Sequence, residues 1–501
     1  MKNLFFTTCG YPHMELVAET MMHYALLGNE IIAVQCGQEI GQCLWNMDKN
    51  KWKCWLCNKH VNVFKRQMPA NVKFVSLASL NNNDKWEEIK KIVFRYKTIE
   101  DIKKIEYNGI NIGYGCVSTY VSKTRNLNPD VDLPYVRVYI DDFLHRLCYQ
   151  TYLHEKIINA EKPDQIFFIN GRISNARSLV EIAKKKNLEY VCVEGAKSVG
   201  GRMCIDNFYN NMPHNLQYRT ALMENYWGDI SVSRKEKEWL GNLFFSNKQN
   251  GKYYGDKNYV EGQVNNLLPD NWNNGNKRYV IFNSSEDEFF AIGDEYDKEK
   301  IFDTQIQGIK FIAQTLINRT NVDLYLRIHP NLKNIKYRYH TDLLKLSDEY
   351  KNITVISGDS KISSYDLMRG ADKIIVFGST MGVESAYSKK VVINLAGALY
   401  KYLNVTYNPK TKEDLCNLLT NDNLKPIDNK EGLLKYGYYF QRKNFISPIF
   451  FPLHYKQIKL FNKTIYLYKY CRILGSRFLY ALINYFIEKQ KGDIIPTEEK
   501  K

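Results

Sequence analysis

The sequence has no long uncharged apolar run among its 501 residues. A helix needs about 20 such residues to span a bilayer, so we expect no transmembrane segment. The N-terminus, Met1 to Phe6, carries a lysine and then a strand-like run, with neither a signal-peptide core nor a small-residue cleavage site. These absences predict a cytoplasmic protein.

A recognised nucleic-acid-binding motif is also missing, as are internal repeats. Nevertheless 70 basic residues outnumber 54 acidic ones, and the formal net charge of +16 favours an anionic partner. We therefore expect a nucleotide, an acidic glycan or a membrane surface as partner, and no nucleic acid. The hydrophobic content of 44% excludes disorder as the main state, and the length suits two domains of about 200 residues each.

Apolar runs of strand length alternate with segments of helical length in the second half of the chain. The runs are Leu324–Ile328, Ile353–Ile356, Ile374–Phe377 and Val391–Leu395, and the helical segments are Thr341–Tyr350, Ser364–Gly370 and Gly382–Ser388. This alternation predicts an α/β fold with a doubly wound parallel sheet. With Arg278–Asn283 as its first strand, the domain should span residues 277–425, after a polar linker at 256–276.

The first half of the chain shows a similar alternation and should form another α/β domain over residues 1–255. Its expected strands are Leu4–Thr8, Glu30–Gln35, Lys73–Leu77, Ile166–Ile169 and Tyr190–Val193. Its expected helices are Met14–Leu27, Lys85–Arg95 and Asn175–Lys186.

Ligands of doubly wound sheets bind at the carboxyl ends of the strands, and polar residues gather there in the second domain. Gly378 allows a turn, and Ser379 and Thr380 stand where the next helix begins, a point at which free N–H groups and the helix dipole attract anions. Gly382 allows close approach, and Glu384 could accept hydrogen bonds from a ribose diol. The alternative is that the hydroxyls only cap a helix whose dipole Glu384 complements.

Further polar residues at the same edge favour a nucleotide site over a simple helix cap. The residues that we expect to bind the nucleotide-containing ligand are Ser284, Arg327, His329, Ser363 and Ser364.

Three segments resemble the donor-binding half of GT-B glycosyltransferases: Arg327–Pro330 (RIHP), Ile362–Asp366 (ISSYD) and Gly378–Glu384 (GSTMGVE). They are most similar to the capsule polysaccharide biosynthesis proteins related to bacterial Kdo transferases. The CDP-glycerol glycerophosphotransferases carry a similar H-P-N and a comparable Ser-rich stretch. The resemblance covers about the last third of the globular part well.

The resemblance implies two Rossmann-like domains that face a cleft, with residues 426–460 crossing back to the first domain. It implies a nucleotide-activated sugar as donor, a lipid-linked or growing surface glycan as acceptor, and no catalytic metal. Backbone N–H groups, Arg327 and His329 would then compensate the charge on the leaving nucleotide. A CDP-glycerol-type transferase and a non-catalytic binding protein of capsule assembly stay open as alternatives, with a UDP-sugar epimerase more remote.

Four side chains are candidates for the base that deprotonates an acceptor hydroxyl. His13 and Glu15 follow the first strand, Asp141 follows the run Val136–Ile140, and Glu194 follows the strand Tyr190–Val193. Each could instead be an ordinary surface or capping residue, and sequence alone does not rank them.

Asn170 and Arg172 follow the strand Ile166–Ile169, so we expect them to line the cleft on the acceptor side. The planar guanidinium of Arg172 is suited to a carboxylate of the acceptor or donor. A brace within its own loop is an equally good reading.

The quartet Cys36, Cys43, Cys54 and Cys57 ends in a C-x-x-C pair and fits a tetrahedral structural zinc site. In a reducing compartment such thiols bind metals or pack in cores rather than form disulfides. An iron–sulfur cluster and a set of unpaired buried thiols are the alternatives.

Residues 461–491 are expected to form a basic amphipathic helix, followed by a disordered tail at 492–501. Its apolar stripe comprises Leu467, Cys471, Leu474, Phe478, Leu482 and Tyr485. With Lys469, Arg472 and Arg477 on the other side, such a helix could lie on an anionic membrane surface. It could equally dock on its own protein.

Overall fold

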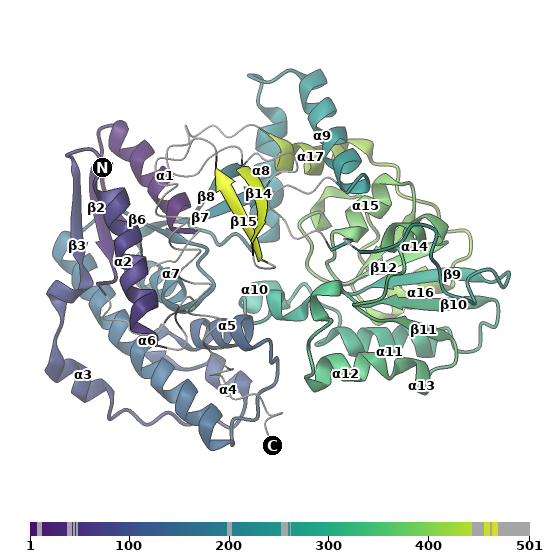
Figure 1. Ribbon diagram of the computed structural model, residues 1–501, viewed down its shortest axis with the longest axis horizontal. Coiled ribbons are helices and arrows are strands. Elements are labelled where there is room, and N and C mark those ends of the chain that lie inside the picture. The colour runs from purple at the N-terminus through teal and green to yellow at the C-terminus, as the bar shows by residue number, and fades with distance from the viewer. Residues whose placement is uncertain are drawn as a thin grey trace.

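The computed structural model describes residues 1–7, 13–37, 43, 46, 49–197, 203–251, 259–260, 262–442, 455–460 and 463–468. Two sheets with helices around them lie side by side (Figure 1). No helix among these residues is long and apolar enough to cross a membrane.

The first sheet has the strand order β3-β2-β1-β6-β7-β8. Its strands are β1 (Lys2–Phe6), β2 (Glu30–Gln35), β3 (Val72–Ser76), β6 (Gln165–Ile169), β7 (Glu189–Lys197) and β8 (Met203–Tyr209). Neighbouring strands pair in parallel except β7 and β8, which are antiparallel. The order is doubly wound, with its switch point between β1 and β6.

Helices cover both faces of this sheet because successive strand residues point to opposite sides. Phe5 packs with α1 (His13–Leu26) and α2 (Lys51–Lys65), while Leu4 and Phe6 pack on the opposite face. The helices on that face are α5 (Gly113–Thr124), α6 (Pro134–Glu161) and α7 (Ser174–Lys186). The smaller elements of this half are α3 (Asn83–Ile89), α4 (Ile99–Lys103), β4 (Glu106–Tyr107) and β5 (Ile110–Asn111).

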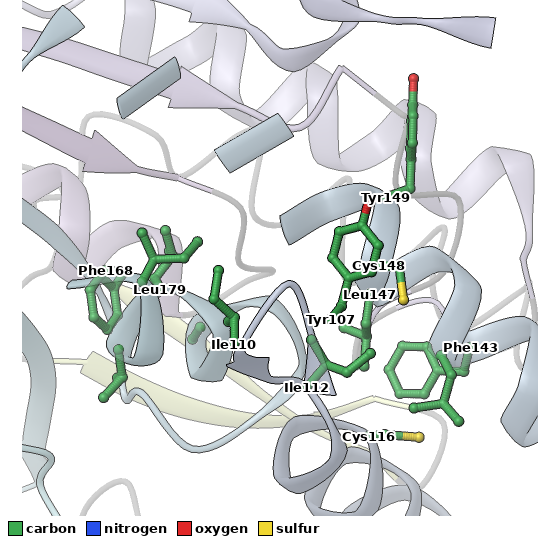
Figure 2. Close-up of a cluster of buried hydrophobic side chains, with 14 of the residues drawn as sticks. Tyr107, Ile110, Ile112, Cys116, Phe143, Leu147, Cys148, Tyr149, Phe168 and Leu179 are labelled. Carbon is green, nitrogen blue, oxygen red and sulfur yellow. The ribbon is translucent and has the colours of Figure 1, made fainter. Parts of the chain in front are cut away.

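Two thiols belong to the core beneath the first sheet. Cys116 and Cys148 are buried among apolar side chains such as Ile112 and Phe143 (Figure 2). Burial raises the pKa of both thiols, that of Cys148 to about 12. They therefore stay protonated at neutral pH and act as small apolar side chains.

The second sheet is fully parallel and has the order β11-β10-β9-β12-β13. Its strands are β9 (Lys277–Phe282), β10 (Val322–Arg327), β11 (Ile353–Ile356), β12 (Lys373–Val376) and β13 (Val391–Asn394). Its helices are α10 (Asp294–Asp297), α11 (Gln305–Thr315), α12 (Arg338–Leu344), α13 (Leu346–Glu349), α14 (Ser364–Gly370), α15 (Met381–Tyr387) and α16 (Lys412–Thr420). The expected fold class, two Rossmann-like doubly wound α/β units, is confirmed.

The stretch that was expected to link the domains contacts the second sheet where it is described. Val264 forms a bridge with Ile362, and the ring of Trp272 lies 4.6 Å from the ring of Tyr325. Trp272 is buried against this sheet.

The run Val136–Ile140, to which the sequence pattern assigned no element, belongs to the 28-residue helix α6, so Asp141 lies within a helix. Two local expectations are wrong. The strand β7 continues through Glu194 to Lys197, because β8 pairs with it along that length. The charged helix expected at Lys85–Arg95 already ends at Ile89 as α3.

The expected C-terminal helix is also wrong over its first residues. β14 (Tyr455–Leu460) and β15 (Lys463–Tyr468) form an antiparallel hairpin. Both segments contain Ile, Tyr and Leu, and β15 also contains Thr; Ile, Tyr and Thr are enriched in strands. The rest of the expected amphipathic helix and the tail lie outside the described residues.

The helices α8 (Leu216–Gly228), α9 (Arg234–Gln249) and α17 (Lys430–Gln441) gather between the two sheets (Figure 1). Gly241 of α9 faces Gly437 of α17, and a Cβ on either glycine would collide with the backbone of the other helix. The two helices therefore cross with their backbones in direct contact.

The end of α17 reaches the first sheet through a buried ion pair. The guanidinium of Arg442 binds the carboxylate of Asp206 on β8, and both side chains are 1% exposed. The hydroxyls of Tyr226 and Tyr439 also donate to this carboxylate. The buried Asp206 carboxylate therefore has a cation and two hydroxyl donors as partners within the protein.

We expect Arg442→Met to lower the free energy of unfolding by about 3–5 kcal/mol, because the substitution leaves the Asp206 carboxylate buried without its cation. Urea denaturation followed by circular dichroism measures the change. The control is Arg234→Met, which breaks the exposed ion pairs with Glu238 and Glu431 and should cost less than about 1 kcal/mol. Small, equal effects of the two substitutions would contradict the assignment.

Candidate functional site

The switch points of both sheets carry the polar residues that the sequence singled out. In the second sheet β9 and β12 are neighbours, and the chain leaves them toward opposite edges. Ser284 follows β9, and Gly378–Thr380 follow β12. In the first sheet Asn170–Arg172 follow β6, and its neighbour β1 leads into residues 8–12, which lie outside the described part. Ligands of open α/β sheets bind at such points.

Contacts with residues 394–400 of the same domain hold the turn at Gly378. Gly378 has φ +78°, and a Cβ there would lie 2.5 Å from the carbonyl oxygen of Gly397. Its N–H donates to Oδ1 of Asn394 (3.2 Å), and the Tyr400 hydroxyl donates to the Ser379 carbonyl (2.6 Å). Only glycine fits this turn, which leaves Thr380 exposed to solvent.

Ser379 acts as a cap, as the alternative interpretation stated. Its Oγ accepts a hydrogen bond from the Met381 N–H (3.3 Å) at the start of α15. The close approach at Gly382 is made by Tyr400, whose hydroxyl would collide with a Cβ there, and no ligand is needed to explain this glycine.

Glu384 faces the interior. Its carboxylate is buried and lies 2.6 Å from the hydroxyl of Tyr365 on α14. Burial raises the pKa of this carboxyl group. In this arrangement Glu384 joins α14 to α15 and is not placed to meet a ribose diol.

Ser284 is likewise used internally. Its Oγ donates to the Phe377 carbonyl (2.8 Å) and accepts from Nε2 of Gln305 (2.9 Å). The Ser284 N–H donates to Oε1 of the same glutamine (3.0 Å). These bonds tie the end of β9 to the end of β12 and to the start of α11.

Arg327 places a buried positive charge under this edge. Its guanidinium donates to the carbonyls of Ser357 and Ser360 and to Oγ of Ser364, and burial lowers its pKa to about 10. Ser363 caps α14 by accepting from the Asp366 N–H (3.2 Å). Of the serines expected at the donor site, Ser364 therefore binds the Arg327 guanidinium, and Ser363 caps α14, the helix that begins with Ser364.

His329 lies at the end of β10. Its N–H donates to Oδ1 of Asn283 (2.7 Å), and its Nδ1 accepts from the Asn331 N–H (3.2 Å). Because Nδ1 accepts, the neutral ring carries its proton on Nε2. The ring of Tyr259 packs against it at 4.6 Å.

The structure brings Asn170, Arg172 and Glu194 together. Asn170, in the left-handed region (φ 60°), donates from Nδ2 to Glu194 (2.6 Å) and accepts from the Arg172 N–H (3.2 Å). Arg172 in turn donates to the carbonyl of Glu288 in the second domain (2.7 Å) and to Ser122 (3.1 Å). This arginine therefore joins the two switch points across the domain boundary.

The other base candidates are placed differently. His13 and Glu15 form the first turn of α1, where Glu15 is completely buried. Asp141 lies on α6 and accepts a hydrogen bond from the Tyr96 hydroxyl (2.9 Å). It does not belong to the hydrogen-bonded group that contains Asn170, Arg172 and Glu194.

The sequence did not reveal several residues that shape the site. Arg125 donates to Ser285 (2.5 Å) and Asp287 (2.9 Å) across the domain boundary. Asn283 and Asn394 fix His329 and Gly378. A signal for the two asparagines was present, because each is a polar residue that closes an otherwise apolar strand run.

Two of the four cysteines of the predicted zinc site share a helix. Cys54 and Cys57 lie one turn apart on α2, and Asn46 donates from Nδ2 to the Cys54 sulfur (3.0 Å). Among the described residues, which include Cys36 and Cys43, no three His, Cys, Asp or Glu side chains gather as a metal site. The four-thiolate arrangement stays a prediction.

Glu286, on the turn after β9, is the most perturbed carboxyl group at this edge. One oxygen accepts from the Gln305 N–H (3.3 Å), and the side chain borders a small cavity of ≈ 30 Å³ shared with Ser284 and Phe377. Burial raises its pKa to about 7.

No protein-family model matches the chain, and no curated protein matches it. Among solved structures it is similar to Thermosulfurimonas dismutans KpsC, beta Kdo 2,4 transferase (15% identity, 55% of this chain and 79% of that chain, TM-score 0.35). The beta Kdo 2,7 transferase of the same protein aligns at 12% identity (66% and 90%, TM-score 0.33). A putative UDP-N-acetylglucosamine 2-epimerase from Listeria monocytogenes aligns at 10% identity (89% and 92%, TM-score 0.26).

Two of these structures are Kdo transferases. The function proposed for this chain rests on its own residues.

The raised pKa of Glu286 predicts a pH-dependent stability. The folded protein holds this proton more tightly than the unfolded chain, so the stabilisation is complete below pH 4.5 and is lost as the pH rises to about 7. Glu286→Gln keeps the hydrogen-bond acceptor and removes the ionisation. We expect its melting temperature to exceed that of the wild type at pH 8 but not at pH 4, as measured by calorimetry. A difference that does not change with pH would show that Glu286 is not held protonated by the fold.

Proposed function

We propose that the chain is a glycosyltransferase that transfers a sugar from a nucleotide-activated donor to a surface-glycan acceptor. The observation that carries the proposal is the pairing of two switch points, because Arg172 at the end of β6 binds the turn that follows β9. Two ligand-binding edges joined in this way suit a donor in one domain and an acceptor in the other.

On the donor side, the exposed turn Gly378–Thr380 would take the phosphates. The N–H groups of Ser379 and Thr380 and the Thr380 hydroxyl are suitable donors for phosphate oxygens. The buried guanidinium of Arg327 and the imidazole of His329 add positive potential where charge develops on the leaving nucleotide. Ser284, Ser363 and Glu384 would hold the elements that carry these groups in place through their internal hydrogen bonds.

On the acceptor side, Glu194 is our first candidate for the base. Its carboxylate is the one among the four candidates that lies in a hydrogen-bonded group with Asn170 and Arg172. A carboxylate there could accept the proton of an attacking hydroxyl while Arg172 orients the acceptor.

The donor assignment predicts which ligands stabilise the folded protein. We expect one nucleotide or activated sugar among CMP, CDP, UDP and GDP derivatives to raise the melting temperature in a thermal-shift screen. Ligand at 100 times its Kd stabilises by about 2.7 kcal/mol. Thr380→Val should reduce the shift, whereas Thr341→Val, at a half-buried threonine on α12, should leave it unchanged.

The nucleotide that binds also separates the alternatives. A shift with CDP-glycerol would replace the sugar donor by a glycerol phosphate donor, and binding followed by no transfer would favour the non-catalytic protein. No shift with any member of the panel would contradict the donor site itself.

We also propose that the cysteine quartet holds a structural zinc. The support is its spacing and the shared face of Cys54 and Cys57 on α2. Elemental analysis of purified protein should find about one zinc per chain, and none after Cys54→Ser with Cys57→Ser. The buried thiols Cys116 and Cys148 provide the control, because serine at either position should leave the zinc content unchanged.

A further inference from the structure

One cavity between the domains lies away from the residues of the switch points. A cavity of ≈ 580 Å³ lies between α7 and residues 210–217 on one side and residues 292–299 on the other. This volume is within the range of small-molecule sites. Its walls come from both domains, so an occupant would contact both at once (α7, α8 and α10 in Figure 1).

The two carboxylates of the cavity are already paired. Glu181 binds the guanidinium of Arg177 (2.9 Å), and Glu299 binds Lys401 (2.6 Å) and the Tyr402 hydroxyl (2.5 Å). They therefore add little negative charge to the space between the walls.

Two lysines of the cavity are not paired in this way. Lys184 on α7 and the exposed Lys298 after α10 line the cavity from the two domains, and neither forms an ion pair with another described residue. Their ammonium groups are the uncompensated charges of this space.

The pKa of the His214 imidazole reflects the electrostatic potential at the first-domain wall of the cavity. Burial, together with the guanidinium groups of Arg172, Arg219 and Arg177, holds its pKa well below the ordinary value. The imidazole is therefore neutral, and the same charges that keep it neutral favour an anion nearby.

The rest of the wall suits hydroxyl groups. Asn211 uses one N–H for the Tyr209 carbonyl (3.1 Å) and one acceptor position for Asn215 (2.8 Å), and an amide has two of each. Gln217 is exposed at the same wall, and the rings of Tyr190 and Tyr296 provide apolar surface. Amides beside aromatic rings can bind the edges and the face of a polyol.

We propose that this interdomain cavity binds a small polyhydroxylated anion, a sugar acid or a sugar phosphate. The anionic group lies between Lys184 and Lys298, and the hydroxyls meet the amides of the first-domain wall. Bound there, the ligand bridges the two domains. The site does not depend on the proposed transferase activity, because it shares no residue with the Gly378 turn.

Isothermal titration of the full chain with four probes tests this site: glucose 6-phosphate, glucuronate, glucose and inorganic phosphate. We expect the first or second to bind at least tenfold more tightly than glucose and inorganic phosphate, and the better of the two identifies the anionic group. Equal binding of inorganic phosphate would reduce the site to an anion site and overturn the polyol part. No binding, or equal binding of glucose, would overturn the proposal.

The variant Lys184→Gln with Lys298→Gln should weaken the bound anion at least tenfold. Lys186→Gln, on the same helix but outside the cavity, is the matched control and should bind as the wild type does. Thr380→Val should also bind normally, which separates this site from the donor turn. Unchanged affinity in the double variant, with its melting temperature also unchanged, would overturn the assignment.

Discussion

Guanidinium groups from the first domain hold the turn that follows β9 in the second domain. Arg125 binds Ser285 and Asp287, Arg172 binds the Glu288 carbonyl, and Arg177 binds the Ile292 carbonyl (2.7 Å). The bidentate, planar fork of arginine fixes orientation as well as distance. The proposed transferase site and the proposed interdomain cavity site both depend on that contact, because it joins the two switch points and the two walls of the cavity.

Sequence patterns predicted the second domain closely and the first less so. In the second sheet β13 is buried on both faces, so it occurs as the run Val391–Asn394, within the expected bounds Val391–Leu395. β8 carries Asp206 and Asn207 and pairs at the antiparallel edge, so its sequence lacks such a run. The length of α6 was missed because a short run, Val136–Ile140, fits a strand and a helix equally well.

For the candidate site, prediction from the sequence was limited in a different way. Sequence located the polar residues at the correct edge but could not say which of them the fold itself uses. Ser284 and Glu384 have internal partners that come from residues distant along the chain, Gln305 and Tyr365. A buried polar group must find such a partner, and a motif does not tell whether a ligand or the protein supplies it.

Arg172 and Tyr296 relate the two proposed binding regions physically. Arg172 braces the switch points and also contributes to the potential around His214. Tyr296 lines the cavity and donates to the Gly397 carbonyl (3.2 Å), and Gly397 in turn packs against Gly378. A ligand can shift a domain arrangement only by binding its states with different affinity. Because the cavity exists only where both domains supply a wall, an occupant favours the domain arrangement in which the two switch points are joined by Arg172.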